Sequence, residues 1–282
     1  MNAQSSSELK VKIEVESKEE GIESPQKKRR RAAKGHVENA QYVIRWKMEQ
    51  NLGDGEDENG MDIFVNHYKG TLIQTTFPDE SGSDDGKIIN EAGQIERVAG
   101  YITCWKINSH NIGNCLGWSF FEVLDPITEE LSDVGSLLDA LENNDGKDNF
   151  INEVGDSDEI LQGSKVYVDK IIVYKEYRGF GLGLFLLDSV VKVINDHMSL
   201  TLINPFPLQY EDITIQDDDS RPHEYPDKGT SLKADKRKIS DYFRKLGFER
   251  IGESMMGLWN GYITPKLLSA APKLKDLNKF LH

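Results

Sequence analysis

The sequence has very few cysteines: only Cys104 and Cys115 occur among its 282 residues. They could pair only with each other, which excludes the multiple-disulfide framework of small secreted domains. The N-terminal segment contains no apolar stretch of the kind found in secretory leaders. These features favour a reduced intracellular protein, and we expect a cytoplasmic location.

Long hydrophobic runs are missing as well. The longest, Leu184–Ile194, is interrupted by Asp188 and Lys192 and is too short to cross a bilayer. No His/Cys pattern indicates a metal site, and neither His110 nor His223 has a suitably spaced partner. We therefore expect neither membrane insertion nor a metal cofactor.

Basic charge is scarce relative to acidic charge. The chain has 34 Lys and Arg against 48 Asp and Glu, which gives a formal net charge of −14. Residues 1–38 contain nine basic and seven acidic side chains, so the remainder carries about −16. Such an acidic body repels nucleic acid and tolerates cationic partners such as amines, although acidity is also a common route to solubility. We expect no nucleic-acid partner.

The first 38 residues differ in composition from the rest. They are polar and charged and lack apolar periodicity, so we expect a disordered tail over residues 1–38. Within this tail, residues 27–31 read KKRRR. We interpret this segment as a solvated stretch, as a contact for an anionic surface or as a nuclear address, and the last reading would add the nucleus to the expected location.

Residues 39–282 have the patterns of a single α/β domain. In its strand-rich half, residues 39–145, four segments are predicted as strands: Gln41–Glu49, Asp62–Phe77, Arg97–Asn108 and Leu116–Leu124. Residues 109–115, SHNIGNC, predict the turn of an antiparallel hairpin between the last two. A helix is predicted over Ile127–Glu142, with Asp125 as its cap and Pro126 in its first turn.

The second half combines strands and helices in a predicted core over residues 164–256. Its expected elements are a strand at Ser164–Tyr174, a buried helix at Leu182–Ile194, a short strand within Ser199–Tyr210, a helix over residues 232–248 closed by Gly247, and one or two strands thereafter. We interpret the polar insertion Glu211–Thr230 as a loop or as a lid. A terminal helix is expected over residues 265–282.

Three glycines in five positions precede the buried helix, in the stretch YRGFGLGLFLLD. Gly179, Gly181 and Gly183 leave room at a helix start, where backbone N–H groups are unpaired and the helix dipole is positive. Arg178 adds a positive charge, so the pattern predicts a phosphate site. A P-loop would require Lys-Ser or Lys-Thr after the glycines, and a dinucleotide loop would require glycine in place of Leu184. Both of these nucleotide loops are therefore excluded.

The spacing that does fit is R-x-x-G-x-G, filled by Arg178, Gly181 and Gly183 after the strand. Downstream, DYFRKLGFERIG places aromatic and basic residues and then Leu-Gly-Phe at the end of a helix, before another strand. Together the two segments resemble the GNAT superfamily of N-acetyltransferases, in which the first is the acetyl-CoA-binding signature. The resemblance covers Ser164 to about Met256.

This resemblance implies a fold, a cofactor and a reaction. The fold would be a central mixed, mostly antiparallel sheet flanked by helices, with splayed strands at the acyl-CoA site. The activity would be that of an acyl-CoA-dependent N-acyltransferase, in which an amine of a small molecule or protein directly attacks the thioester of acetyl-CoA. The residues implied in cofactor binding are Ile172, Val173, Tyr174, Arg178, Gly179, Phe180, Gly181, Leu182, Gly183 and Phe243.

The resemblance leaves alternatives open for the catalytic acid and the catalytic base. Many family members have a tyrosine four residues before the glycine of Gly-Phe; here Phe243 occupies that position, and Tyr242 lies about 100° around the helix. Tyr242 is one hypothesis for the acid that protonates the thiolate, and solvent is the other. Asp169 and Glu176 are candidates for the general base. A domain that binds acyl-CoA without turnover is the alternative function.

Two further features depart from the family. Its members typically place two helices between their first and second strands, whereas strands dominate this sequence up to Leu124, so the acceptor side is expected to be built differently. The helix that contains Tyr242 also begins with KADKRKIS where an asparagine is common. Lys236, Arg237 and Lys238 are interpreted either as a contact for the 3′-phosphate of CoA or as a solvated face.

Overall fold

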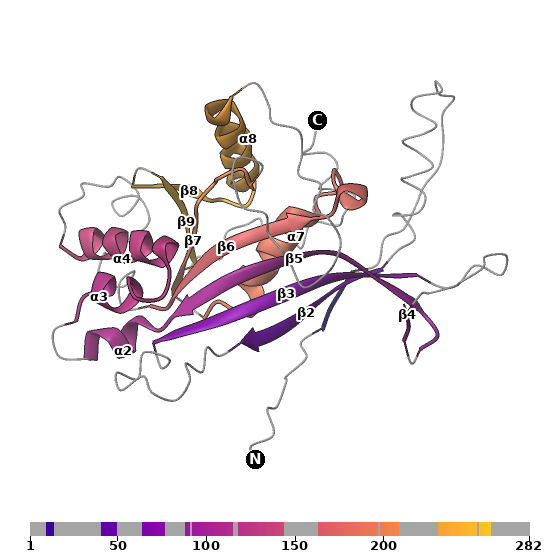
Figure 1. Ribbon diagram of the computed structural model, residues 1–282, viewed down its shortest axis with the longest axis horizontal. Coiled ribbons are helices and arrows are strands. Elements are labelled where there is room, and N and C mark those ends of the chain that lie inside the picture. Colours follow the sequence, from indigo (N-terminus) through magenta and orange to yellow (C-terminus); the bar gives the residue numbers. More distant parts are fainter. Residues whose placement is uncertain are drawn as a thin grey trace, which may run out of the picture.

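A nine-stranded sheet forms the centre of the described part of the chain in the computed structural model (Figure 1). The structure describes residues 10–13, 41–49, 64–76, 88–90, 92–114, 118–143, 163–196, 198–208, 231–252 and 254–260. The strands follow the order β1-β2-β3-β5-β6-β7-β9-β8 across the sheet, and β4 pairs with β5.

The elements have the following bounds. The strands are β1 (Lys10–Ile13), β2 (Gln41–Glu49), β3 (Val65–Thr76), β4 (Ile88–Ile89), β5 (Ile95–Ile107), β6 (Lys165–Val173), β7 (Ser199–Ile203), β8 (Glu249–Ile251) and β9 (Met255–Asn260). The helices are α2 (Ser109–Asn114), α3 (Phe120–Leu124), α4 (Glu129–Glu142), α7 (Leu182–Val193) and α8 (Leu232–Arg244), with a 3₁₀ turn, η2, at Lys175–Tyr177.

Among the strands that the structure describes, one neighbouring pair is parallel. β6 and β7 run in the same direction, whereas all other paired strands are antiparallel. α7 joins β6 to β7 and so supplies the crossover that a parallel pair requires. The predicted mixed, mostly antiparallel sheet flanked by helices is therefore confirmed.

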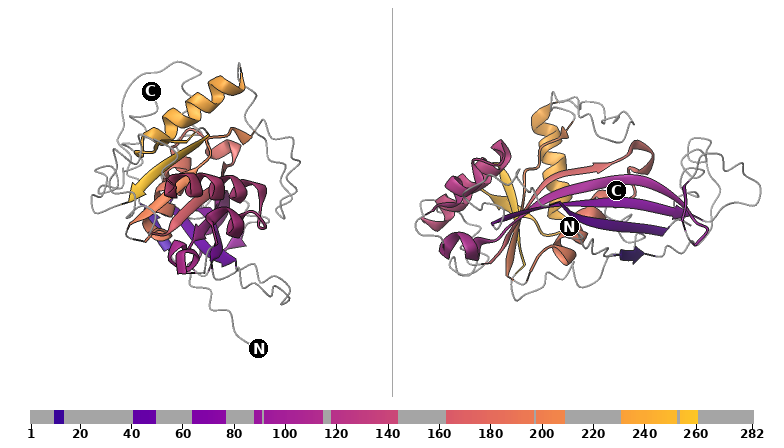
Figure 2. Two further views of the ribbon diagram at one scale, coloured as in Figure 1. Left: turned by 90° about the vertical axis from the view of Figure 1, so that its left-hand side faces the viewer. Right: turned by 60° about the horizontal axis from the view of Figure 1, so that its bottom comes forward.

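Helices pack on both faces of the sheet, because successive side chains of a strand point to opposite faces. Val166 and Val168 of β6 belong to the core that contains α7, whereas Tyr167 belongs to the core that contains α3 and α4. In Figure 1, α2, α3 and α4 gather at one end of the long strands and β4 lies at the other. The right-hand view of Figure 2 shows the same separation.

The predicted hairpin is wrong in its second half. β5 ends at Ile107, and the chain then forms α2 in the segment predicted as the turn and α3 in the segment predicted as a strand, residues 116–124. The Ser119 hydroxyl accepts a hydrogen bond from the Glu122 N–H at 3.2 Å, and the Glu122 carboxylate accepts one from the Ser119 N–H at 2.9 Å. This capping box begins a helix despite the strand propensity of the aromatic residues around it. The edge of β5 pairs with β6 instead.

The start of α4 also differs from the prediction. Its N-cap is Thr128, whose hydroxyl accepts a hydrogen bond from the Leu131 N–H at 3.2 Å. Asp125, the predicted cap, instead ends α3 and accepts a hydrogen bond from the Ser132 hydroxyl at 2.7 Å. Helices α2, α3 and α4 therefore all lie between β5 and β6, where a single helix was expected.

A buried lysine joins these helices to the sheet. Lys165, the first residue of β6, donates hydrogen bonds to the Ser109 hydroxyl of α2 at 3.0 Å and to the carbonyl oxygen of Gly163. Its ammonium also lies 5.9 Å from the centre of the Phe120 ring in α3. Burial lowers the pKa of Lys165 to about 7, against the opposing effect of the Glu142 carboxylate. Lys165 therefore attaches α2 and α3 to β6, although its burial removes water from the ammonium, which is unfavourable.

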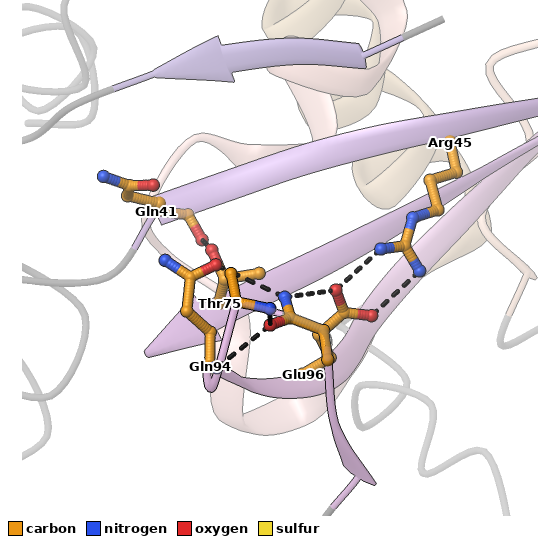
Figure 3. A network of polar contacts seen from close by, with 7 residues as sticks. Gln41, Arg45, Thr75, Gln94 and Glu96 are labelled. Atoms are coloured by element: carbon orange, nitrogen blue, oxygen red, sulfur yellow. Dashed lines mark hydrogen bonds and ion pairs between the residues drawn. The ribbon is translucent and has the colours of Figure 1, made fainter. Parts of the chain in front are cut away.

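A polar network fixes the far end of the long strands (Figure 3). Arg45 of β2 donates two hydrogen bonds to the Glu96 carboxylate of β5, at 2.8 and 2.6 Å. Asn90, in the turn between β4 and β5, donates to the same carboxylate at 2.9 Å and accepts a hydrogen bond from the Gln94 N–H at 3.0 Å. Bidentate pairs of this kind restrict the relative orientation of their two partners. The network lies at the end of the sheet away from α2, α3 and α4.

Four residues of the predicted disordered tail form a strand, so the prediction is wrong at those positions. β1 pairs with β2, from Lys10 opposite Arg45 to Ile13 opposite Tyr42. The basic segment 27–31, the insertion Glu211–Thr230 and the predicted helix over residues 265–282 lie outside the described residues. None of the helices in the described ranges has the length and apolar character needed to span a bilayer.

Candidate functional site

β6 and β7 separate partway along their length. Their parallel register runs from Lys165 opposite Leu200 to Val168 opposite Ile203, where β7 ends. β6 continues to Val173 without β7 beside it. The edge of β6 over residues 169–173 is therefore open to a ligand, as predicted from the expected splay of these strands.

A β-bulge lies at the point of separation. On β5, Cys104 is opposite Val168 and Thr103 is opposite Lys170, so Asp169 is an extra residue in β6. A bulge bends its strand and increases the local twist, which gives a physical cause for the divergence of β6 from β7. Asp169 is consequently at the start of the open edge.

Gly100 keeps the end of β6 paired on its other side. It lies opposite Val173, and a Cβ at this position would lie 2.2 Å from the carbonyl oxygen of Ile172. Glycine is therefore required for the close approach of β5 and β6 at this point. Because β6 stays on β5, the opening forms between β6 and β7.

A cleft of about 270 Å³ occupies this opening. It is lined by the end of β6, the glycine loop and first turn of α7, the segment after β7, and one face of α8. The cleft thus brings together the two segments that the sequence analysis identified separately. Of the predicted site residues, it is lined by Asp169, Ile172, Val173, Arg178, Gly179, Leu182, Gly183, Tyr242 and Phe243.

The glycine loop adopts a backbone geometry that favours glycine at two of its positions. Gly179 and Gly181 have φ angles of 83° and 75°, in the left-handed region that favours glycine. Gly181 is also the N-cap of α7. Within the described part of the chain, five successive backbone N–H groups lack an acceptor, those of Gly179, Phe180, Gly181, Leu182 and Gly183. These groups, together with the helix dipole, form a candidate anion site.

Arg178 is held at the mouth of this loop. Its Nε–H donates a hydrogen bond to the carbonyl oxygen of Val173 at 2.9 Å. The guanidinium therefore stays beside the end of β6 and lines the cleft. A fixed positive charge at this position favours binding of an anionic group by the loop.

Tyr242 reaches from α8 to the first turn of α7. Its phenolic oxygen accepts a hydrogen bond from the Leu184 N–H at 3.1 Å. A Cβ on Gly183 would lie 3.3 Å from this oxygen, so the absence of a side chain there leaves room for the phenol. Burial raises the pKa of Tyr242 to about 12, although the hydrogen bond from Leu184 acts in the opposite direction. Tyr242 lies about 100° around the helix from Phe243, yet both residues line the cleft.

Asp169 places a carboxylate in the cleft. This carboxylate accepts a hydrogen bond from the Thr103 hydroxyl at 3.0 Å. Burial raises the pKa of Asp169, and the Glu130 carboxylate acts in the same direction; Lys170, the Thr103 hydrogen bond and His67 lower it. A half-buried carboxylate with a raised pKa is a suitable acceptor for a proton from an amine.

Other predicted residues lie outside the lining. Glu176 is exposed in η2, so the two candidate bases are in different environments. Tyr174 is buried in the core, and its N–H donates to the Ala99 carbonyl oxygen at 2.9 Å. Phe180 packs against the same core, and Gly181 acts through the backbone.

The sequence analysis missed several lining residues: Ile171, Tyr177, Ile203, Asn204, Phe206, Leu208 and Ile239. A signal was present for one of them, because Ile239, Tyr242 and Phe243 have the i, i+3, i+4 spacing of a single helix face. The segment after β7 carried no comparable signal. Its contribution depends on the divergence of β6 from β7.

Asn204 is the most informative of the missed residues. Its Oδ1 atom is buried and has no hydrogen-bond donor among the described residues. A buried acceptor without a donor is costly in a folded protein. In a cleft, such an atom fits a ligand that supplies an N–H group.

The described residues contain no group of three or more His, Cys, Asp or Glu side chains placed to hold a metal ion. Cys104 is buried with a free thiol, while Cys115 lies outside the described ranges. Comparisons with family models, with curated proteins and with solved structures found no match to this chain.

Proposed function

We propose that this protein is an acyl-CoA-dependent N-acyltransferase of the GNAT type, which transfers an acetyl group from acetyl-CoA to an amine. The observation that carries the proposal is the row of five backbone N–H groups at the start of α7, of which three belong to residues that line the cleft, Gly179, Leu182 and Gly183. A pyrophosphate fits such a row because unpaired N–H groups can donate to its oxygens and the helix dipole favours its negative charge.

The residues of the cleft fit the rest of a CoA thioester. The open edge of β6 over residues 169–173 offers backbone hydrogen-bonding groups to an extended arm that contains amides. The buried Oδ1 atom of Asn204 fits an amide N–H of the same arm. Arg178 would contact the phosphate end of the ligand.

Asp169 and Tyr242 are the residues that would exchange protons in this reaction. Bound acetyl-CoA would supply an activated acetyl group, whose transfer to an amine forms an amide and releases a thiol. Asp169 would remove the proton of the ammonium, directly or through water, because burial increases the affinity of its carboxylate for protons. Tyr242, with its pKa raised to about 12, retains its proton at neutral pH and would donate it to the departing thiolate.

Two measurements test the proposal. Calorimetry with CoA is expected to give saturable binding, and absence of binding at millimolar CoA would overturn the proposal. Release of free thiol from acetyl-CoA is then measured with a panel of small amines and amine-containing peptides. Release that depends on an amine supports the transferase, whereas binding without release would identify a domain that holds acyl-CoA without turnover.

A further inference from the structure

A second pocket lies beside α8 and carries strong positive charge. It has a volume of about 610 Å³ and is lined by residues of α8 and β8, by Pro205 and by the residues that begin β9. We call it the basic pocket, after its five cationic lining residues: Lys233, Lys236, Arg237, Arg244 and Arg250. No acidic side chain is among the described residues that line it.

The helix presents most of these cations on one face. Lys233, Lys236, Arg237, Ser240 and Arg244 follow the i, i+3, i+4, i+7, i+11 spacing, so their side chains form a stripe. The stripe is about 16 Å long at 1.5 Å of rise per residue. The residues of α8 that line the cleft described above lie on the neighbouring face of the helix. The basic pocket and the cleft therefore share no lining residue.

Some of these cations have no acidic partner within the described part of the chain. Lys233 and Arg237 have no acidic partner there, and Lys236 lies 4.8 Å from the centre of the Phe206 ring. Arg244 pairs with Asp241 at 2.6 Å, and both side chains are more than half exposed, so the pair contributes little. In a chain with a net charge of −14, such a concentration of like charge favours the binding of an anion.

We propose that the basic pocket binds a compact anion with at least two phosphate groups. Phosphate concentrates up to two negative charges and three acceptor oxygens in one group, which matches a pocket rich in N–H donors better than isolated carboxylates do. A concave pocket favours a compact ligand over an extended chain. Met255 and Met256 line the pocket at the start of β9, and their side chains are buried in the cores on opposite faces of the sheet.

The position of Lys236 links this site to the first cleft. Phe206, which its ammonium faces, lines that cleft, and the preceding residue, Pro205, lines the basic pocket. An anion that draws Lys236 toward the basic pocket would therefore alter a wall of the cleft. The binding itself does not depend on the function proposed above.

Inorganic pyrophosphate is a suitable probe, with binding followed by the methyl NMR signals of Met255 and Met256. These methionines line the basic pocket and do not line the cleft, so their signals are reporters of the proposed site. We expect saturable shifts that weaken steeply with salt, because the contacts are between charges. Absence of shifts at millimolar pyrophosphate would overturn the proposal.

Two variants of the same helix distinguish the pocket from general electrostatic attraction. Lys233→Gln combined with Arg237→Gln removes two lining charges and is expected to lower affinity at least about tenfold, given about 1.5 kcal/mol for a hydrogen bond to a charged group. Lys238→Gln removes a charge that pairs with Asp235 outside the pocket, and is expected to change affinity less than about twofold. Equal losses in the two proteins would refute a specific pocket.

A variant of the glycine loop separates the two anion sites. Gly179→Asp adds a carboxylate to the loop before α7, where nothing lies within 4 Å of a Cβ. The methionine shifts with pyrophosphate are expected to persist in this protein. Their disappearance would mean that pyrophosphate acts through the loop, and the proposal of a separate site would be wrong.

Discussion

The phenolic oxygen of Tyr242 and the backbone N–H of Leu184 form a hydrogen bond of 3.1 Å between α8 and the first turn of α7. This contact joins the two sequence segments that resemble the GNAT superfamily. It also positions the hydroxyl at the end of the row of backbone N–H groups proposed to bind pyrophosphate.

Tyr242→Phe is expected to reduce kcat about 100-fold, the lower range for loss of a general acid, while the KM for acetyl-CoA changes little. The Leu184 N–H also loses its acceptor, so the free energy of unfolding should fall by about 1 kcal/mol. Thiol-release kinetics and thermal unfolding measure the two effects. An unchanged kcat in a folded protein would assign thiolate protonation to solvent.

Asp169→Asn is expected to lower kcat about 100-fold and to change the pH profile. A general base must be deprotonated, so the wild-type rate should rise with pH through the raised pKa of Asp169. The variant should lack this rise. Glu176→Gln is the matched control, because Glu176 is exposed and lies outside the cleft lining. The base assignment would be wrong if the two variants had the same kinetics.

Gly179→Asp and Gly179→Asn form a pair that isolates charge from shape. Gly179 has φ of 83° and a Cβ there would point into open space, and both Asp and Asn tolerate left-handed backbone better than most residues. The aspartate places a negative charge beside the proposed pyrophosphate site. We expect it to weaken CoA binding at least about tenfold relative to the asparagine variant, measured by calorimetry at low salt. Equal affinities would remove the loop from the CoA site.

Lys165→Met tests the buried ammonium that joins β6 to α2 and α3. The pKa of Lys165 is lowered to about 7 in the folded protein, whereas an exposed lysine has a pKa of about 10.4. Between these values the unfolded chain binds a proton that the folded chain does not, so the contribution of Lys165 to stability improves as pH rises from 7 to 10.

The melting temperature of Lys165→Met minus that of the wild type should therefore be larger at pH 6 than at pH 9.5. Thermal unfolding across this range measures it. The same change at exposed Lys47 controls for the removal of a charge. A difference that does not vary with pH would show that Lys165 is adequately solvated or paired.

Much of the fold was predictable because its elements carry local signals. The alternation in Gln41–Glu49 and the apolar run after Gly183 each predicted an element that the structure contains. Residues 116–124 were misassigned because aromatic residues favour strands on average, and the Ser119 and Glu122 capping box was overlooked. The prediction for β1 failed because this four-residue strand is held by its pairing with β2. Such a short strand shows no clear alternation of apolar residues in the sequence.

The amino-acid sequence by itself determined the glycine loop. Left-handed backbone at Gly179 and Gly181 and the start of a helix directly after Gly181 are compatible with residue type and spacing. Tertiary structure alone decided the cleft around it. The bulge at Asp169, the end of β7 at Ile203 and the approach of Tyr242 to Leu184 depend on contacts between segments far apart in the chain, and no local pattern encodes such contacts.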